Sequence, residues 1–196
     1  AKCGSTGKCP SPTSGQRPGR NWSADVPAEF LPAYEATMLA EGGYKLTNDP
    51  VDRGGQTYAG ISRRANPNWT GWAFIDAEDR PPASMVRAYY LQNYWDVLRL
   101  SEVSSQKVAT SLYGSAVNSG AKTAAKLAQL VVGATPDGAL GPITLSLIND
   151  TAPEVFIAQF TIAKIARYRD IVTKDRSQMK YFLGWVNRAL KEAEWA

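Results

Sequence analysis

The sequence predicts a mainly α-helical fold with one small β element. Three observations support this prediction. Apolar residues recur at three- and four-residue spacing in several stretches after residue 26, and glycine or proline separates those stretches. Only the segment from Lys45 to Arg64 combines turn formers with strand-like residues, which favours a short hairpin or small sheet there. The chain has 196 residues, of which 44% are hydrophobic and 20% charged, so it can build an ordinary globular core.

The first 26 residues differ in composition from the remainder. They are rich in Gly, Pro, Ser, Thr and basic residues and hold almost no large apolar side chain. We therefore expect residues 1–26 to be a poorly ordered leader or linker and residues 27–196 to form one domain. Cys3 and Cys9 could close a disulfide loop in an oxidising compartment, and two free thiols are the alternative.

The first predicted helix places a carboxylate at its C-terminal end. It runs from about Pro27 to Glu41, and its apolar face holds Phe30, Leu31, Tyr34 and Met38. Glu41 continues that face, and Gly42 ends the helix. Burial and the negative end of the helix dipole both disfavour an ionised carboxylate, so we expect a raised pKa for Glu41. A partly exposed glutamate at a frayed helix end is the alternative.

Further helices are predicted along the rest of the chain. The apolar spacing places them at about residues 84–98, 105–119, 122–132, a short stretch from Pro142, 153–173 and 178–195. Trp69 and Trp72 fall in a stretch with Pro and Gly that we interpret as a loop.

The composition excludes several classes of catalysis. The chain has no histidine, which excludes Ser-His-Asp and Cys-His catalysis and HExxH zinc chemistry. Two cysteines cannot build a thiolate zinc cage, no phosphate-binding loop is present, and no apolar run is long enough to span a membrane. The 18 carboxylates therefore favour carboxylate chemistry such as glycoside hydrolysis.

One constellation suits that chemistry. An inward Glu41 could keep its proton near neutral pH and donate it to a glycosidic oxygen. Asp49, Asp52 and Thr57 follow in the turn-rich segment, where a second carboxylate or a hydroxyl could position water or stabilise an oxocarbenium-like transition state.

Several motifs occur in a fixed order along the chain. They are EGGY at 41–44, DPVDRGGQTYAGI at 49–61, YWD at 94–96, AVNSG at 116–120, DGALGPIT at 137–144 and GWVNR at 184–188. Together, over about residues 28–190, they resemble glycoside hydrolase family 108. These enzymes are peptidoglycan N-acetylmuramidases of phage endolysins and of bacterial secretion-associated lysozymes. Residues 115–150 resemble the peptidoglycan-binding segment of that family.

The resemblance implies a mainly α, lysozyme-like α+β fold with the small β-hairpin next to the catalytic helix. It implies cleavage of the β-1,4 bond between N-acetylmuramic acid and N-acetylglucosamine, with Glu41 as the general acid and no metal or organic cofactor. By the same resemblance, Asp52 and Thr57 position water or stabilise positive charge, and Asp49 is the competing carboxylate. The family places an Asp three residues before its Val-Asn pair, where this chain has Gly114.

Four further residues are candidates for substrate binding. Asn118 could hydrogen-bond an N-acetyl group or cap its helix, and Tyr44 could stack on a sugar or pack against the hairpin. Gln56 could donate to substrate in the cleft. Trp185 could line the groove, although a tryptophan on an amphipathic helix more often belongs to a core.

The predicted partner is peptidoglycan. A net charge of +4 favours an anionic wall, while the dispersed basic residues argue against nucleic acid. We expect a monomer with no membrane span that acts in the periplasm or outside the cell, and an immunity protein could be a further partner. Lytic transglycosylase activity and a non-catalytic wall-binding role are the competing hypotheses.

Overall fold

The protein is mostly helical, with one three-stranded antiparallel sheet. The computed structural model describes residues 27–40, 43–48 and 55–194, so the predicted leader with Cys3 and Cys9 lies outside the described residues. The longer helices are α1 (Phe30–Ala40), α3 (Ala83–Tyr90), α4 (Gln106–Ser119), α5 (Ala121–Val131), α6 (Pro142–Asp150), α7 (Pro153–Lys174) and α8 (Met179–Glu194). This arrangement confirms the predicted mainly α fold with a small β element.

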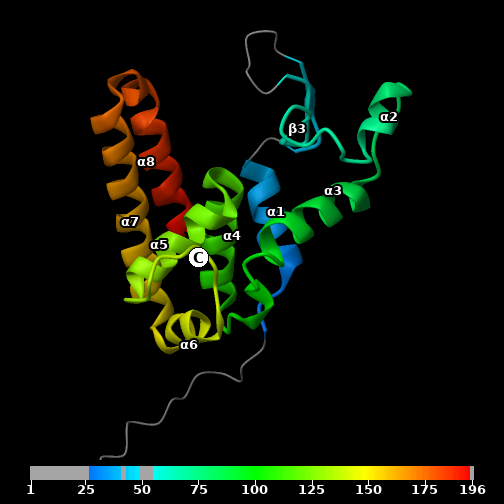
Figure 1. Ribbon diagram of the computed structural model, residues 1–196. Helices are drawn as coiled ribbons and strands as arrows, with labels where there is room; N and C mark the ends of the chain where they lie inside the picture. Colours follow the sequence, from blue (N-terminus) through cyan, green and yellow to red (C-terminus); the bar gives the residue numbers. More distant parts are fainter. Residues whose placement is uncertain (1–26, 41–42, 49–54, 195–196) are drawn as a thin grey trace, which may run out of the picture.

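Helix α4 forms the centre of the molecule and packs against α1, α5, α7 and α8 (Figure 1). All nine residues from Val108 to Ala116 are buried, which is typical of a helix surrounded by others. The Ser105 hydroxyl caps its N-terminus by accepting a hydrogen bond from the Val108 N–H at 3.4 Å. Gly120, with a φ of 88°, ends the helix and allows the chain to turn directly into α5.

Helix α1 packs one face against α4 and the aromatic residues around it. Phe30 contacts Trp95 and Tyr113 at ring-centroid distances of 5.8 Å, and Tyr34 contacts Phe30 at 5.3 Å. The buried face also includes Ala33, Thr37 and Met38. The prediction was wrong for Leu31, which is 52% exposed, because the buried stripe turns towards residues 33 and 37 rather than 31.

The sheet consists of β1 (Leu46–Thr47), β2 (Thr57–Tyr58) and β3 (Ile61–Ser62), in that order. Ala59 and Gly60 connect β2 to β3 with φ values of 49° and 79°, as a two-residue hairpin of type I′ requires. A Cβ on Gly60 would lie 2.5 Å from the Tyr90 hydroxyl oxygen, so the turn also needs glycine for space. That hydroxyl donates to the Ala59 carbonyl at 2.8 Å and holds the hairpin against α3.

Two predictions of local structure need correction. Residues 72–76 form a short helix, α2 (Trp72–Asp76), where a loop was expected. The Trp72 indole is buried and donates to the Asn66 carbonyl at 2.7 Å, so tertiary packing orders this segment. The helix expected at 84–98 is α3 followed by a π-helical turn at Leu91–Trp95.

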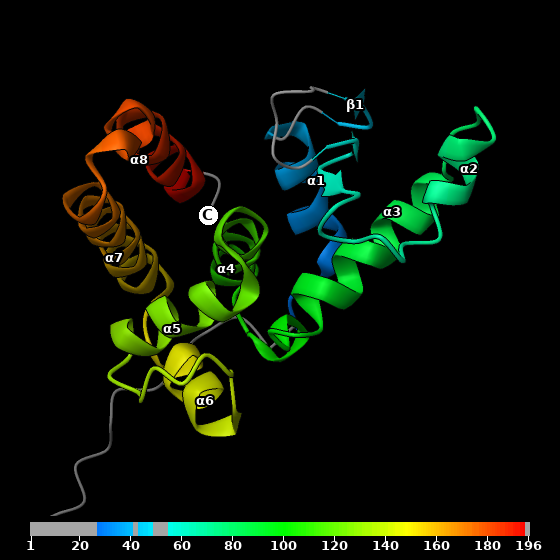
Figure 2. The same ribbon diagram turned by 45° about the horizontal axis from the view of Figure 1, so that its top comes forward.

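Helices α7 and α8 form an antiparallel pair joined by a 3₁₀ turn at Arg176–Gln178. In both views this pair lies on one side of α4, and α1 with the sheet lies on the other side (Figure 2). The arrangement leaves the C-terminal end of α4 between the pair and the sheet.

Candidate functional site

The structure describes the surroundings of the predicted carboxylates rather than the carboxylates themselves. Glu41, Asp49 and Asp52 lie outside the described residues. Helix α1 is described up to Ala40, immediately before Glu41 in the chain, and β1 and β2 flank the segment that contains both aspartates. The described elements around the candidate site are therefore the end of α1, the sheet, and helices α4, α7 and α8.

Thr57 lies on β2 opposite Thr47 of β1. Its hydroxyl donates to the Gly55 carbonyl at 3.2 Å, and its own carbonyl accepts from the Thr47 hydroxyl at 3.4 Å. Because side chains alternate along a strand, Thr57 and Tyr58 point to opposite faces of the sheet. Tyr58 is buried towards α2 and stacks on Trp69, so Thr57 belongs to the other, more polar face.

Gln56 joins the sheet to α2. Its side-chain oxygen accepts from Arg63 at 2.8 Å, and Arg63 makes two further bonds, of 2.6 and 2.7 Å, to the Asp76 carboxylate. These bonds lower the pKa of Asp76. The Arg63 guanidinium also lies 5.2 Å from the centre of the Trp72 ring. In this structure Gln56 therefore holds the β-rich region together, at the edge of a hollow of about 640 Å³ that Tyr44 also lines.

Tyr44 connects the segment after α1 to the helix itself. Its hydroxyl is hydrogen-bonded to the Tyr34 hydroxyl at 2.9 Å, while 42% of the residue remains exposed. Burial, followed by this hydrogen bond, raises the pKa of Tyr34. Tyr44 thus combines an anchored hydroxyl with an accessible ring next to the end of α1.

Asn118 belongs to a polar network that sequence reasoning did not find. Its amide nitrogen donates to the Gly114 carbonyl at 3.0 Å and to the Glu192 carboxylate at 2.7 Å. The amide oxygen accepts from the Arg188 guanidinium. The other oxygen of Glu192 accepts from the Lys164 ammonium at 2.8 Å. Asn118 is therefore oriented by groups from α7 and α8.

Lys164 and Glu192 are almost completely buried, with exposures of 1% and 4%. One signal in the sequence could have revealed the lysine, because it interrupts the apolar stripe of Phe160 and Tyr168 at four-residue spacing. A charge at such a position needs a buried partner. Nothing in the local sequence identifies Glu192, 28 residues away, as that partner.

Trp185 lies between two tyrosines at the α7–α8 pair. Its ring lies 5.5 Å from that of Tyr168 on α7 and 5.9 Å from that of Tyr181, one turn earlier on α8. Tyr181 is 48% exposed, and Trp185 is partly buried. Burial, followed by the charge of Glu192, raises the pKa of Tyr168, and the same Glu192 carboxylate bonds Asn118.

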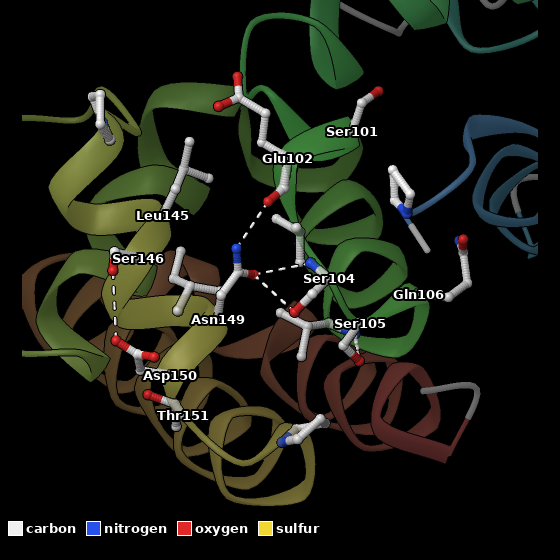
Figure 3. Close-up of a pocket in the computed structure, with 16 residues that line it drawn as sticks. Ser101, Glu102, Ser104, Ser105, Gln106, Leu145, Ser146, Asn149, Asp150 and Thr151 are labelled. Carbon is white, nitrogen blue, oxygen red and sulfur yellow. Dashed lines mark hydrogen bonds between the residues drawn. The ribbon is translucent and has the colours of Figure 1, made fainter. Parts of the chain in front are cut away.

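A separate pocket lies elsewhere among the described residues. It has a volume of about 760 Å³ and is formed by the loop at 101–105, α6 and the start of α7 (Figure 3). Asn149 crosses it, accepting from the Ser104 N–H at 2.9 Å and donating to the Glu102 carbonyl at 2.9 Å. None of the predicted site residues that the structure describes lines this pocket, and its polar groups connect α6 to the loop before α4.

No group of three or more His, Cys, Asp or Glu side chains in residues 27–40, 43–48 and 55–194 is placed to hold a metal ion. Over the same residues, no helix combines the length and apolar character needed to cross a membrane.

Comparisons with known proteins support the motifs described above. Residues 34–120 match the model of the family described as Glycosyl hydrolase 108, and residues 123–190 match the model described as a predicted peptidoglycan domain. The structure is similar to that of Brucella abortus SagA, with 25% sequence identity and a TM-score of 0.67 over 83% of this chain and 90% of that one. No curated protein matches the sequence.

Proposed function

Because this chain is a member of glycosyl hydrolase family 108 whose family domain is followed by a peptidoglycan domain, we propose that it is an N-acetylmuramidase. It hydrolyses the β-1,4 bond between N-acetylmuramic acid and N-acetylglucosamine in peptidoglycan. The observation that supports this most strongly is the family match over residues 34–120, which spans the end of α1, the sheet and all of α4. Such an enzyme would work outside the cytoplasm, where the wall lies.

Glu41 is the general acid in this proposal. In the sequence it comes directly after Ala40, where α1 ends, and the negative end of a helix dipole favours the protonated form of a carboxyl group. A protonated Glu41 donates its proton to the glycosidic oxygen as the bond breaks, and positive charge develops on the sugar ring.

The second role is to activate water or to stabilise the developing cation. Asp52 is the proposed group because it precedes the two glycines of the family motif, and Asp49 is the competing carboxylate. Thr57 supports this assignment from the polar face of the sheet, where its hydroxyl is already held by the backbone at Gly55.

The remaining predicted residues have supporting roles in this proposal. Both protons of the Asn118 amide nitrogen already bond to Gly114 and Glu192, so Asn118 can accept from the N–H of an N-acetyl group with the second lone pair of its amide oxygen, which also accepts from Arg188. Tyr44 offers an accessible ring beside α1, and Trp185 supports the aromatic row on α8. Gln56 acts indirectly by fixing Arg63 and the β-rich region.

The deciding experiment digests purified peptidoglycan with the wild-type protein and with Glu41→Gln, and analyses the products by mass spectrometry. We expect muropeptides with reducing muramic ends from the wild type and a loss of at least 100-fold in rate for the variant, since general acid catalysis contributes about 10²–10⁴-fold. Glu35→Gln is the matched control, because Glu35 lies on the exposed side of the same helix and should keep full activity.

The other outcomes identify the competing functions. Products with 1,6-anhydro muramic ends would show a lytic transglycosylase, in which the 6-hydroxyl of the sugar attacks in place of water. Binding to the wall with no product from either folded protein would contradict the enzyme and leave a wall-binding module.

A further inference from the structure

Helix α8 carries one stripe of functional side chains at positions 181, 185, 188 and 192. The spacing of four, three and four residues places Tyr181, Trp185, Arg188 and Glu192 on one face of the helix. Going along the stripe, two stacked aromatic rings are followed by an exposed guanidinium and then by a buried carboxylate. Arg188 and Glu192 of this stripe contact Asn118 of α4. Helix α8 and the sheet lie on opposite sides of α4 (Figure 2).

At the buried end of the stripe, Glu192 forms an ion pair with Lys164 of α7. This pair orients Asn118, which in turn contacts the exposed Arg188. Lys164 bonds one oxygen of Glu192 at 2.8 Å, and the other oxygen holds the amide nitrogen of Asn118 at 2.7 Å. This fixes the amide plane, so its oxygen is presented to Arg188. Buried ion pairs are weak sources of stability compared with apolar packing of the same size, which favours an orienting role for this pair.

Gly114 lies beside this network, between Glu192 and α1. A Cβ at Gly114 would lie 3.7 Å from the carboxyl carbon of Glu192 and 3.9 Å from the Thr37 hydroxyl oxygen. Thr37 lies on α1, four residues before position 41. The network therefore adjoins the face of α1 that leads to the proposed acid.

From these contacts we propose that Arg188 binds a carboxylate of the substrate, contributed by the peptide that peptidoglycan carries on its muramic acid residues. Arg188 is then a residue that determines specificity, and Glu192, acting through Asn118, is a positioning residue. The inference rests on the proposed function. It adds to that function a residue, Arg188, that recognises the carboxylates by which peptidoglycan differs from uncharged glycans.

The chemistry of the stripe fits such a ligand. A guanidinium is a planar fork of N–H donors that matches a carboxylate with two parallel hydrogen bonds. The row of Tyr168, Trp185 and Tyr181 beside it supplies the apolar wall against which the C–H faces of a sugar can pack. Lys180, whose ammonium lies 4.9 Å from the centre of the Tyr181 ring, adds positive charge on the same helix. An anionic peptidoglycan strand complements the positive charge of this surface.

The test measures binding to peptidoglycan sacculi free of teichoic acid, in a Glu41→Gln background so that the polymer stays intact. The sacculi are used untreated and after their carboxylates have been converted to uncharged carboxamides. We expect Arg188→Met to weaken binding to untreated sacculi about tenfold, the scale of one charge-assisted contact. Amidation should weaken binding of the parent protein by a similar factor beyond its effect on the Arg188→Met variant, in which only the general attraction of the net positive charge remains.

Arg176→Met is the matched control, because Arg176 is equally exposed but lies in the turn between α7 and α8. It should bind like the parent and keep its sensitivity to amidation. Replacing the buried pair together, by Lys164→Met with Glu192→Leu, should reduce the sensitivity to amidation although Arg188 is still present.

Three results would overturn the inference. They are an Arg188→Met variant that binds like the parent, one that responds to amidation as strongly as the parent, and one that loses binding equally to untreated and amidated sacculi. Because binding is measured without turnover, a failure of the muramidase proposal in the digestion assay leaves this result readable on its own.

Discussion

At the scale of single residues, Tyr113 shows how a buried side chain can lack a polar partner. Its ring fills the space between Phe30 and Trp95, and it is completely buried. Its hydroxyl has no hydrogen-bond partner among the described residues. Burial is also the main reason for the raised pKa of this hydroxyl. The ring stabilises the core, whereas the hydroxyl opposes burial.

We therefore expect Tyr113→Phe to stabilise the protein by about 1 kcal/mol, because it removes a polar group whose desolvation is not compensated. In a chain of this size the melting temperature should rise by roughly 2–4 °C, measured by circular dichroism. Tyr90→Phe is the contrasting variant, since the Tyr90 hydroxyl bonds the Ala59 carbonyl at 2.8 Å, and it should lower the melting temperature. Equal effects of the two changes would contradict this account.

At the scale of elements, one clamp orders the connection between α5 and α6. The buried side chain of Gln129 donates to Asp137 at 2.7 Å and to the Ala139 carbonyl at 3.0 Å, and it accepts from the Gly138 N–H at 2.9 Å. Asp137 also accepts from the Ala139 N–H at 2.9 Å. The DGALGPIT motif is therefore held by α5, and its Pro142 begins α6.

The hydrogen bond from Gln129, followed by that from Ala139, lowers the pKa of Asp137 in the folded protein. A lowered folded-state pKa stabilises the protein above the unfolded value of about 4, and this contribution is lost as the pH falls through the folded-state pKa. We expect Asp137→Asn to be less stable than the wild type at pH 6, with a difference that shrinks as the pH falls towards 2. Thermal melts across this range test it, with Asp170→Asn at an exposed site as the control. A difference that does not depend on pH would contradict the assignment.

At the scale of the whole molecule, α4 joins two halves that both contribute to the candidate site. One half consists of α1 and the sheet, and the other is the α7–α8 pair (Figure 1). Asn118 connects them because its helix packs on α1 while its side chain bonds to Glu192 and Arg188 of α8. The match to SagA over most of both chains indicates that this arrangement of helices is shared.

The buried Lys164–Glu192 pair should make the α7–α8 half sensitive to single substitutions. Lys164→Met leaves a buried carboxylate without its cation, and we expect a loss of about 3–5 kcal/mol. Combining it with Glu192→Leu should recover most of that loss, because the uncompensated charge is gone. Denaturant unfolding of both variants measures the difference, and a double variant that is less stable than the single one would show that the pair stabilises the fold directly.

The sequence by itself determined the helices and the local motif of the site. Apolar spacing and Gly or Pro boundaries are properties of neighbouring residues, so α4, α5, α6 and α7 appear close to their predicted limits. The EGGY and DRGGQTYAGI strings are likewise contiguous, and they predicted the family whose model matches residues 34–120.

Tertiary structure alone decided which side chains complete the site. The periodicity of α1 could not tell that Leu31 faces solvent while Thr37 is buried, because both lie near the edge of the same stripe. The contacts of Asn118 with Arg188 and Glu192 span 70 and 74 positions in the chain, and each depends on how α8 packs against α4. Local sequence fixes what each helix presents, but only the packing of helices distant in the chain decides which of those groups meet.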